Sequence, residues 1–327
     1  MRAPIRLGLQ IPNFNFPGVS PEGLFERLME IAATAERSGF DSLFVMDHLH
    51  QIPGVGPPTN WMLEGNTTLA APAGRTERLQ LGLMVGGVTY RNPALHAKIT
   101  TTLDVISGGR AIHSLGAAWF EDEHRAYGFD FPPLKERFER LEEALQIARA
   151  MFTQDSPSFE GHHYRIENVL NNPRPLRGDV PILVGGSGER KTLRLVAKYA
   201  DGSNIFGDAE RVRHLVGVIE QHCEDVGRDP AEITKTRLGS LVIGRTHEDA
   251  ERKLEILRGR SGMPEERLRM MVTLGDPDEV GERAQDFLDA GLDGLIFNIA
   301  DVEDLETVRL AGQALSRLAV PAERSSP

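Results

Sequence analysis

Short runs of apolar residues alternate along the chain with longer segments in which apolar residues recur every three or four positions. The short runs fit buried parallel strands, and the longer segments fit the helices that connect such strands. We expect eight strands, at Ile5–Gln10, Ser42–Met46, Leu79–Val85, Ala111–Leu115, Pro181–Val184, Gly202–Ile205, Leu238–Ile243 and Leu292–Phe297. This alternation predicts an α/β fold.

Three of the longer segments carry their apolar residues on one helical face, which we expect to cover the strands. The faces are formed by Leu24, Leu28, Ile31 and Ala35, by Leu95, Ile99, Leu103 and Ile106, and by Leu134, Phe138, Leu141, Leu145 and Phe152. Boundary residues agree, because Ser20-Pro21 and Asn92-Pro93 fit an N-cap followed by proline, and Gly39 suits the left-handed C′ position.

Eight alternating strands fit either a closed barrel or a doubly wound open sheet. The open sheet places a glycine-rich fingerprint after its first strand, where this chain has Gln10-Ile11-Pro12-Asn13. We therefore predict a (β/α)8 TIM barrel that takes up residues 1–327 as a single domain. Two segments depart from the alternation, Ala117–Pro133 and Ser156–Val180, the second with Gly161 at a possible hairpin turn. Both are expected as insertions over the C-terminal mouth.

The charge balance and the cysteine count exclude several partners. The chain carries 37 Lys and Arg against 48 Asp and Glu, and it has no basic run that would follow a phosphate backbone, so we expect no nucleic-acid partner. Cys223 is the only cysteine, which excludes a disulfide within one chain and suits a reducing cytoplasm. No signal peptide and no apolar run of about 18 residues occur, so we expect a cytoplasmic protein without a membrane span.

In a TIM barrel the active site lies where the strands end. Asp47, His48 and His50 follow the second expected strand. An imidazole there can transfer a proton near pH 7 or bind a metal, and two histidines on one face of a continuing strand would suit a metal-dependent amidohydrolase. No consistent set of further ligands accompanies them, so we expect no metal. A histidine that is hydrogen-bonded in the core or caps a loop is the other interpretation.

A glycine-rich segment follows the fifth expected strand and leads into a helical segment. Glycines let backbone N–H groups approach an anion, and a helix N-terminus adds a partial positive charge. Gly185, Gly186, Ser187 and Gly188 therefore predict a phosphate-binding loop, although a plain tight turn has the same composition.

Small and aromatic residues follow the fourth expected strand. Ala117, Ala118 and Trp119 suit the floor and the wall of a site for a planar ring, and Glu121 would be a nearby acid or orienting group. Small residues packed against a capping loop would give the same pattern.

Taken together, these segments resemble the luciferase-like flavin oxidoreductase superfamily, and within it the branch that uses the deazaflavin coenzyme F420. Each motif is weak, but the motifs occur in the family's order and span most of the chain. The matching segments are Ala35–His48, Leu81–Val85, Arg91–Ala94, Leu103–Arg110, Leu115–His124, Pro181–Glu189 and Ala200–Asn204.

The resemblance implies roles for the candidate residues. His48 would be the proton donor or orienting group beside the deazaflavin ring, with Asp47 next to it, and Glu121 matches the position of an acidic catalytic group in some members. Met84-Val85 matches a bulge with a non-prolyl cis peptide behind the ring. The implied cofactor contacts are Asp47, Met84, Val85, Ala117, Ala118, Gly185, Gly186, Ser187, Gly188, Ser203 and Asn204.

The implied activity is hydride transfer between C5 of coenzyme F420 and a small organic substrate, by a protein that forms homodimers. The alternatives are an FMN-dependent monooxygenase and a non-catalytic flavin-binding protein on the same scaffold. A deazaflavin does not support the one-electron oxygen chemistry of a flavin, so the cofactor decides the reaction. Asn66 and Pro72 depart from the family's pattern, and the substrate side of the site is therefore not inferred.

Overall fold

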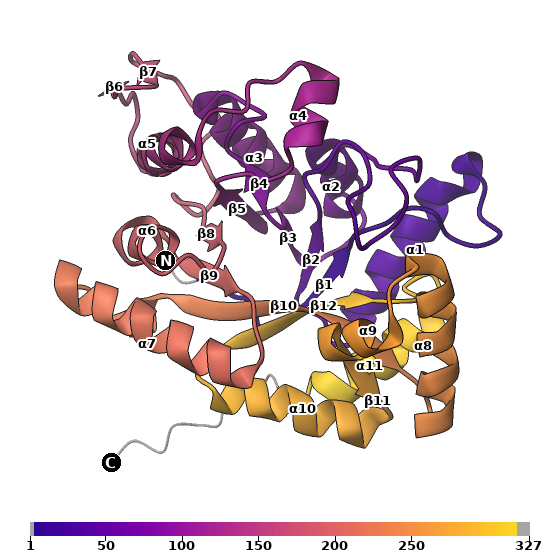
Figure 1. Cartoon of the computed structure of the whole chain (residues 1–327). Helices are drawn as coiled ribbons and strands as arrows, with labels where there is room; N and C mark the ends of the chain where they lie inside the picture. Colours follow the sequence, from indigo (N-terminus) through magenta and orange to yellow (C-terminus); the bar gives the residue numbers. More distant parts are fainter. Residues whose placement is uncertain (1–2, 319–327) are drawn as a thin grey trace.

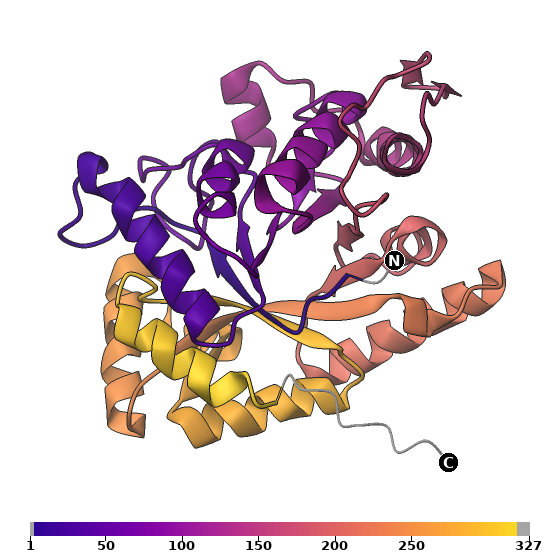
Figure 2. The same cartoon turned by 180° about the vertical axis from the view of Figure 1, so that it is seen from behind.

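The computed structural model describes residues 3–318 and contains a closed barrel of eight parallel strands surrounded by helices (Figures 1 and 2). In order around the barrel, the strands are β1 (Leu7–Ile11), β2 (Ser42–Val45), β3 (Gln80–Leu83), β5 (Ala111–Gly116), β8 (Ile182–Gly185), β9 (Gly202–Ile205), β10 (Thr234–Ile243) and β12 (Gly294–Ile299). β12 pairs with both β10 and β1, which closes the ring. The predicted TIM barrel is confirmed.

Two further strands pair with the ring and were not expected. β4 (Gly86–Gly87) follows the bulge after β3 and pairs with β5. β11 (Val272–Gly275) pairs with the second half of β10, while the first half of β10 pairs with β9. β10 is therefore longer than the expected Leu238–Ile243, because it serves a different neighbour along each half.

Eleven α-helices lie among the described residues, and most of them follow a barrel strand. They are α1 (Leu24–Arg37), α2 (Gly65–Ala73), α3 (Pro93–Ser107), α4 (Glu121–Tyr127), α5 (Leu134–Thr153), α6 (Thr192–Tyr199), α7 (Ala209–Val226), α8 (His247–Ser261), α9 (Glu265–Met271), α10 (Pro277–Asp289) and α11 (Leu305–Leu315). The Asn92 side chain caps α3 as expected, and Gly39 follows α1 with φ 101°. Ser20 precedes a short 3-10 turn, Pro21–Gly23, and not α1 itself, and its side chain makes no capping hydrogen bond.

The apolar face expected to bury α3 was wrong in part, because Leu103 is buried but both ends of the face are exposed. Leu95 and Ile106 are 55% and 47% exposed. The buried face of α3 instead carries His96, Ala97 and Thr100, so polar and small side chains pack toward β5. The buried Thr100 hydroxyl has a hydrogen-bond acceptor within its own helix, because it donates to the carbonyl of His96 at 3.1 Å.

The two insertions lie at different positions relative to the mouth of the barrel. The segment 117–133 contains α4 and borders the mouth of the barrel. The segment 156–180 contains a hairpin of β6 (Phe159–Glu160) and β7 (Arg165–Ile166), with Gly161 at the turn as expected. This hairpin projects beside α5 (Figure 1), where the Glu143 carboxylate accepts hydrogen bonds from the backbone N–H groups of His162, His163 and Tyr164. The expected position over the mouth was wrong for this second insertion.

The barrel interior is packed below its mouth. A separate apolar cluster fills it, made of Ala3, Ile5, Phe44, Met84, Ile112, Leu183 and Ile296. The larger core lies between the strands and the helices. Because the interior is filled, a ligand can enter only among the loops at the strand ends. Among the described residues, no helix is long and apolar enough to cross a membrane.

Candidate active site

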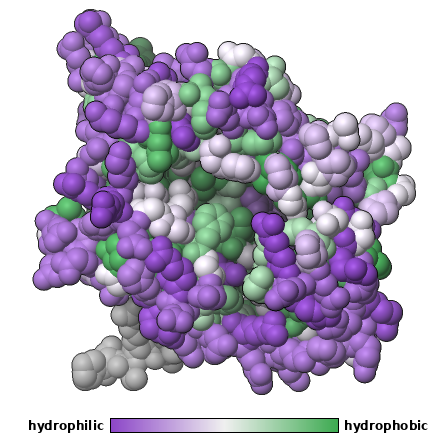
Figure 3. Space-filling model, viewed as in Figure 1, coloured by the Kyte–Doolittle hydropathy of each residue, from purple (hydrophilic) through white to green (hydrophobic). Residues whose placement is uncertain are grey.

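A cavity of ≈ 530 Å³ opens where β2, β3, β5, β8 and β9 end. Figure 3 shows a hollow near the middle of this face, with apolar residues around it. Most of the residues predicted for the site line the cavity: Asp47, His48, Met84, Val85, Ala117, Ala118, Gly185, Gly186, Gly188 and Asn204. The strand-end rule therefore brings together residues from five separate strands.

The floor of the cavity is formed by the bulge after β3. The Met84-Val85 peptide bond is cis, as the resemblance implied. A Cβ atom added to Gly116 or Gly185 would come within 2.9 or 2.8 Å of the Val85 side chain, so only glycine fits on either side of it. The Gln10 side chain donates to the Met84 carbonyl at 3.0 Å and holds the bulge from below. The floor is therefore apolar, flat and fixed.

The glycine loop after β8 forms one end of the cavity, but it offers different donors from those expected. The N–H of Gly186 donates to the carbonyl of Asn204 at 2.9 Å and is thus committed to the sheet. Within residues 3–318, the backbone N–H groups of Ser187 and Gly188 have no hydrogen-bond partner. Thr192, the first residue of α6, also lines the cavity, and a Cβ on Gly188 would lie 2.8 Å from its hydroxyl oxygen. These groups together form a small polar end suited to an anion.

A buried carboxylate organises the other end of the cavity. The Glu123 side chain of α4 is fully buried, and its Oε2 lies 2.9 Å from Nδ1 of His48. It also accepts hydrogen bonds from the Tyr90 hydroxyl and from the backbone N–H groups of Leu49 and His50. Burial by itself raises the pKa of Glu123, but these hydrogen bonds outweigh it and lower the pKa to about 2. The residue is therefore an anion that fixes the position of His48.

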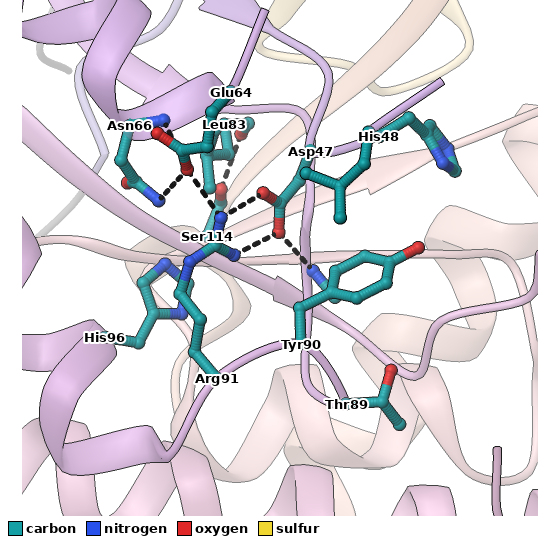
Figure 4. A network of polar contacts seen from close by, with 12 residues as sticks. Asp47, His48, Glu64, Asn66, Leu83, Thr89, Tyr90, Arg91, His96 and Ser114 are labelled. Atoms are coloured by element: carbon teal, nitrogen blue, oxygen red, sulfur yellow. Dashed lines mark hydrogen bonds and ion pairs between the residues drawn. The ribbon is translucent and has the colours of Figure 1, made fainter. Parts of the chain in front are cut away.

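Asp47 is tied to the backbone of the bulge rather than free for chemistry (Figure 4). Its carboxylate accepts from the N–H of Gly87 at 2.9 Å and from both terminal nitrogens of Arg91 at 2.7 and 2.8 Å. Arg91 also donates to Glu64 at 2.7 Å. Burial disfavours the charge of Arg91, but the hydrogen bonds and charges of Asp47 and Glu64 prevail and raise its pKa. Asp47 therefore positions the segment that carries Tyr90.

Three predicted residues lie outside the cavity. Glu121 is 59% exposed on α4 and pairs with Arg125. The Ser187 hydroxyl is occupied by the backbone of Phe206, whose N–H donates to it at 2.8 Å. Ser203 is buried, and its neighbour Asn204 is the residue of β9 that lines the cavity, because successive side chains of a strand point to opposite faces.

The two histidines after β2 do not share a site. His48 lines the cavity and lies edge-on to Trp119, with 5.7 Å between the ring centroids. His50 lies against Phe120 and Tyr127 instead. No group of three or more potential metal-ligating side chains occurs in the described part of the chain.

Sequence reasoning missed Glu123, Tyr90 and Thr192. The sequence Glu121-Asp122-Glu123 offers three acids, and nothing in it marks which one is buried. Thr192 follows Arg190-Lys191, and no glycine or other turn residue marks it as part of the loop. The signal that could have found Thr192 is its position, since the first helical residue after a glycine loop contributes to anion binding.

Curated proteins similar to this chain are named for one coenzyme. The chain is 28% identical over 305 residues to the F420-dependent glucose-6-phosphate dehydrogenase of Amycolatopsis mediterranei (strain U-32), a match that covers 83% of this chain and 87% of that protein. It is 30% identical over 302 residues to the protein of the same name from Nocardia farcinica (strain IFM 10152), with the same two coverages.

Solved structures with the same fold serve different reactions. An F420-dependent secondary alcohol dehydrogenase in complex with an F420-acetone adduct superposes with a TM-score of 0.81 at 18% identity, and the match covers 98% of this chain and 100% of that one. A monooxygenase from Streptomyces bottropensis superposes with a TM-score of 0.80 at 21% identity, covering 97% and 100%. The model of the luciferase-like monooxygenase family matches residues 5–263, which is more than half of the chain, and the chain therefore belongs to that family.

Proposed function

We propose that this chain is an F420-dependent oxidoreductase in which His48 transfers a proton to or from a small organic substrate during hydride transfer. The observation that carries the proposal is the pair of His48 and Glu123 at the edge of the cavity, 2.9 Å apart. A buried anion behind an imidazole is the arrangement that orients a general base.

The cavity fits the coenzyme. Its floor at Val85, between two glycines, matches the flat face of a ring, and its polar end at Gly188 and Thr192 matches a phosphate. When bound, the deazaflavin would supply a hydride donor or acceptor at C5. The residues that would hold it therefore come from the floor and from the glycine loop, and not from the His48 side.

The chain's own groups account for the proton. Because Glu123 is ionised, Nδ1 of His48 carries the hydrogen that the carboxylate accepts, and Nε2 is left for the cavity. This nitrogen can take the hydroxyl proton of an alcohol as the substrate is oxidised, and it returns that proton to the oxygen when a carbonyl is reduced. The positive charge that develops on the ring lies next to Glu123.

The curated relatives support coenzyme F420 over FMN, because their printed names carry that coenzyme over most of the chain's length. The solved structures do not separate the two coenzymes, since similar folds serve an F420-dependent dehydrogenase and a monooxygenase.

Titration of the purified protein with each coenzyme tests the proposal. We expect F420 to bind at least tenfold more tightly than FMN. The variant His48→Ala should bind F420 within about tenfold of the parent but lose roughly 10²–10⁴-fold in turnover, the typical contribution of a positioned proton-transfer group. Tighter binding of FMN would overturn the coenzyme, and a fully active His48→Ala variant would overturn the role of His48.

We also propose that the protein is a cytoplasmic homodimer in which residues 1–327 act as one domain. Leu95 and Ile106 are exposed on one face of α3, and Val105 is exposed beside Ile106, which supports an interface there. Cys223 is buried and free, which suits a reducing compartment. Light scattering of the parent and of a Leu95→Glu, Ile106→Glu double variant tests the interface, and a parent that is monomeric at micromolar concentration would refute it.

A further inference from the structure

A second cavity lies beside the coenzyme cavity, between the segment after β1, the loop 54–60 and the helices α8 and α9. This second chamber has a volume of ≈ 350 Å³. Its walls are mostly apolar and include Phe16, Val55, Leu257, Met263 and Met271. It is separate from the glycine loop and from His48, which line the coenzyme cavity.

The charged residues that line the second chamber form one ion pair. Arg260 and Glu303 are the charged residues among its described lining residues, and they pair with each other at 3.4 Å. A pair of this kind neutralises itself. A phosphorylated group placed here would lose its hydration without gaining a cation.

One polar atom in the second chamber lacks a partner. The side-chain oxygen of Asn298 is buried and makes no hydrogen bond to any described residue. Asn298 follows Phe297 near the end of β12, so its side chain lies at the mouth of the barrel, where it lines the chamber. A buried acceptor without a donor is costly, which points to a ligand that brings one.

A third cavity lies between the second chamber and the coenzyme cavity. The second chamber shares Val55, Met271 and Asn298 with this third cavity, which has a volume of ≈ 740 Å³. That third cavity extends to Phe206, which also lines the coenzyme cavity and is 48% exposed. Shared lining residues therefore make the three cavities neighbours, with Phe206 between the coenzyme cavity and the third cavity.

We infer that the second chamber holds the distal part of the substrate, and that this part is uncharged, largely apolar and carries one hydrogen-bond donor. This inference rests on the proposed function and names the substrate class: an elongated alcohol, or the corresponding carbonyl compound, whose distal part is uncharged. The curated relatives are named for glucose-6-phosphate, an anion. The described lining of the second chamber offers such an anion no cation other than Arg260, which is already paired with Glu303.

A direct binding test uses N-phenyl-1-naphthylamine, an uncharged apolar fluorophore with one N–H donor. The parent should bind it with enhanced fluorescence, in the absence and in the presence of F420. Leu257→Trp fills the chamber and should weaken binding at least tenfold. Ile256→Trp is the matched control, because Ile256 is the preceding residue of α8, is 56% exposed and does not line the chamber. Asn298→Ala should weaken binding several-fold, since it removes the acceptor.

A kinetic test uses secondary alcohols from 2-propanol to 2-nonanol with the F420-loaded enzyme. In the parent, KM should fall with chain length, and Leu257→Trp should raise the ratio of KM for 2-nonanol to KM for 2-propanol at least tenfold. If that variant does not fold, Met263→Trp replaces it, because Met263 lines the same chamber. Melting temperatures of all variants accompany both tests.

Three outcomes would overturn the inference: fluorophore binding that is equal in Leu257→Trp and Ile256→Trp, displacement of the fluorophore by F420, or displacement by glucose-6-phosphate. Failure of the proposed function is a different result, because it would show as absent F420 binding by the parent. Fluorophore binding does not depend on the coenzyme, so the two failures are distinguishable.

Discussion

Replacement of Glu123 by glutamine tests how the site prepares His48. Glutamine keeps the size of the side chain and turns one carboxylate oxygen into an NH2 group. Oε1 accepts from the backbone N–H groups of Leu49 and His50, whereas Oε2 accepts from the Tyr90 hydroxyl and faces Nδ1 of His48. The NH2 group must take one of these two places.

The two possible positions of the glutamine NH2 group differ in their free-energy cost. In the place of Oε1, the NH2 group would face two backbone donors, each of which would be left unsatisfied at a cost of about 1–3 kcal/mol. In the place of Oε2, it would face the Tyr90 hydroxyl and Nδ1 of His48, both of which can accept a hydrogen bond. The second place is therefore favoured. Nδ1 then becomes an acceptor, and the hydrogen of the ring moves to Nε2, the nitrogen that must take the substrate proton.

We expect Glu123→Gln to lower kcat by about 10²–10⁴-fold, the range for loss of a proton-transfer group, with the dissociation constant of F420 changed by less than about tenfold. The matched control is Glu121→Gln, the same substitution two residues earlier at a site that is 59% exposed, which should leave kcat and stability unchanged. Steady-state kinetics and direct F420 titration separate kcat from binding.

A double-mutant cycle distinguishes positioning from a merely structural role. If Glu123 acts through His48, the loss of kcat caused by Glu123→Gln should disappear in a protein that already carries His48→Ala. An equal loss in both backgrounds, or an unchanged kcat in a stably folded Glu123→Gln variant, would refute the reasoning.

Three further predictions concern stability and the polar end of the cavity. Because the folded pKa of Glu123 is about 2, below its ordinary value of 4.5, its ionised form stabilises the fold above pH of about 4.5, and this contribution is lost as the pH falls toward 2. Urea unfolding at pH 5 and pH 3 should therefore show a smaller loss of stability in Glu123→Gln than in the parent. Gly188→Val should weaken F420 binding at least tenfold by crowding the polar end, whereas Gly178→Val, at a distant glycine with φ 77° and open space around it, should lower the melting temperature and leave F420 binding unchanged. Asp47→Asn should lower the free energy of unfolding by about 3–5 kcal/mol, because it leaves the buried Arg91 charge without its main partner, and equilibrium denaturation measures this.

The barrel was predictable because its signals are local, whereas the cis peptide of the floor was implied only by the family resemblance. A short apolar run followed by Asp47-His48 or by Gly185-Gly186 identifies a strand and the direction of its end, and the strand ends of a TIM barrel meet at one face. The row of Leu95 and Ile106 was misassigned for the opposite reason. Its helical period is clear, but a period shows only that the residues share a face of the helix. It does not show whether that face packs against the barrel or is exposed.

The role of Asp47 illustrates a second limit. Its place beside His48 suggested chemistry, yet its carboxylate is engaged by Gly87 and Arg91, which lie 40 and 44 residues away in the sequence. Such a contact depends on the path of the bulge after β3, and no spacing rule connects these positions. A carboxylate at a strand end therefore identifies the site without telling whether it acts on the substrate or holds the loop.

The choice between Glu121 and Glu123 depends on the phase of α4. Side chains two positions apart on an α-helix point in directions that differ by about 200° around the helix axis. One of these acids therefore faces the barrel when the other faces solvent. An apolar stripe usually reveals the buried side of a helix, but α4 has the sequence Glu-Asp-Glu-His-Arg-Ala-Tyr, and its buried residues are Glu123 and His124. Its inward face is polar because it meets polar groups: His124 lies 2.6 Å from the Thr89 hydroxyl, and Glu123 meets His48. A helix that buries charged side chains instead of apolar ones has no apolar stripe to show which side faces the core. The acid that orients the histidine can therefore be identified only from its contacts in the folded structure.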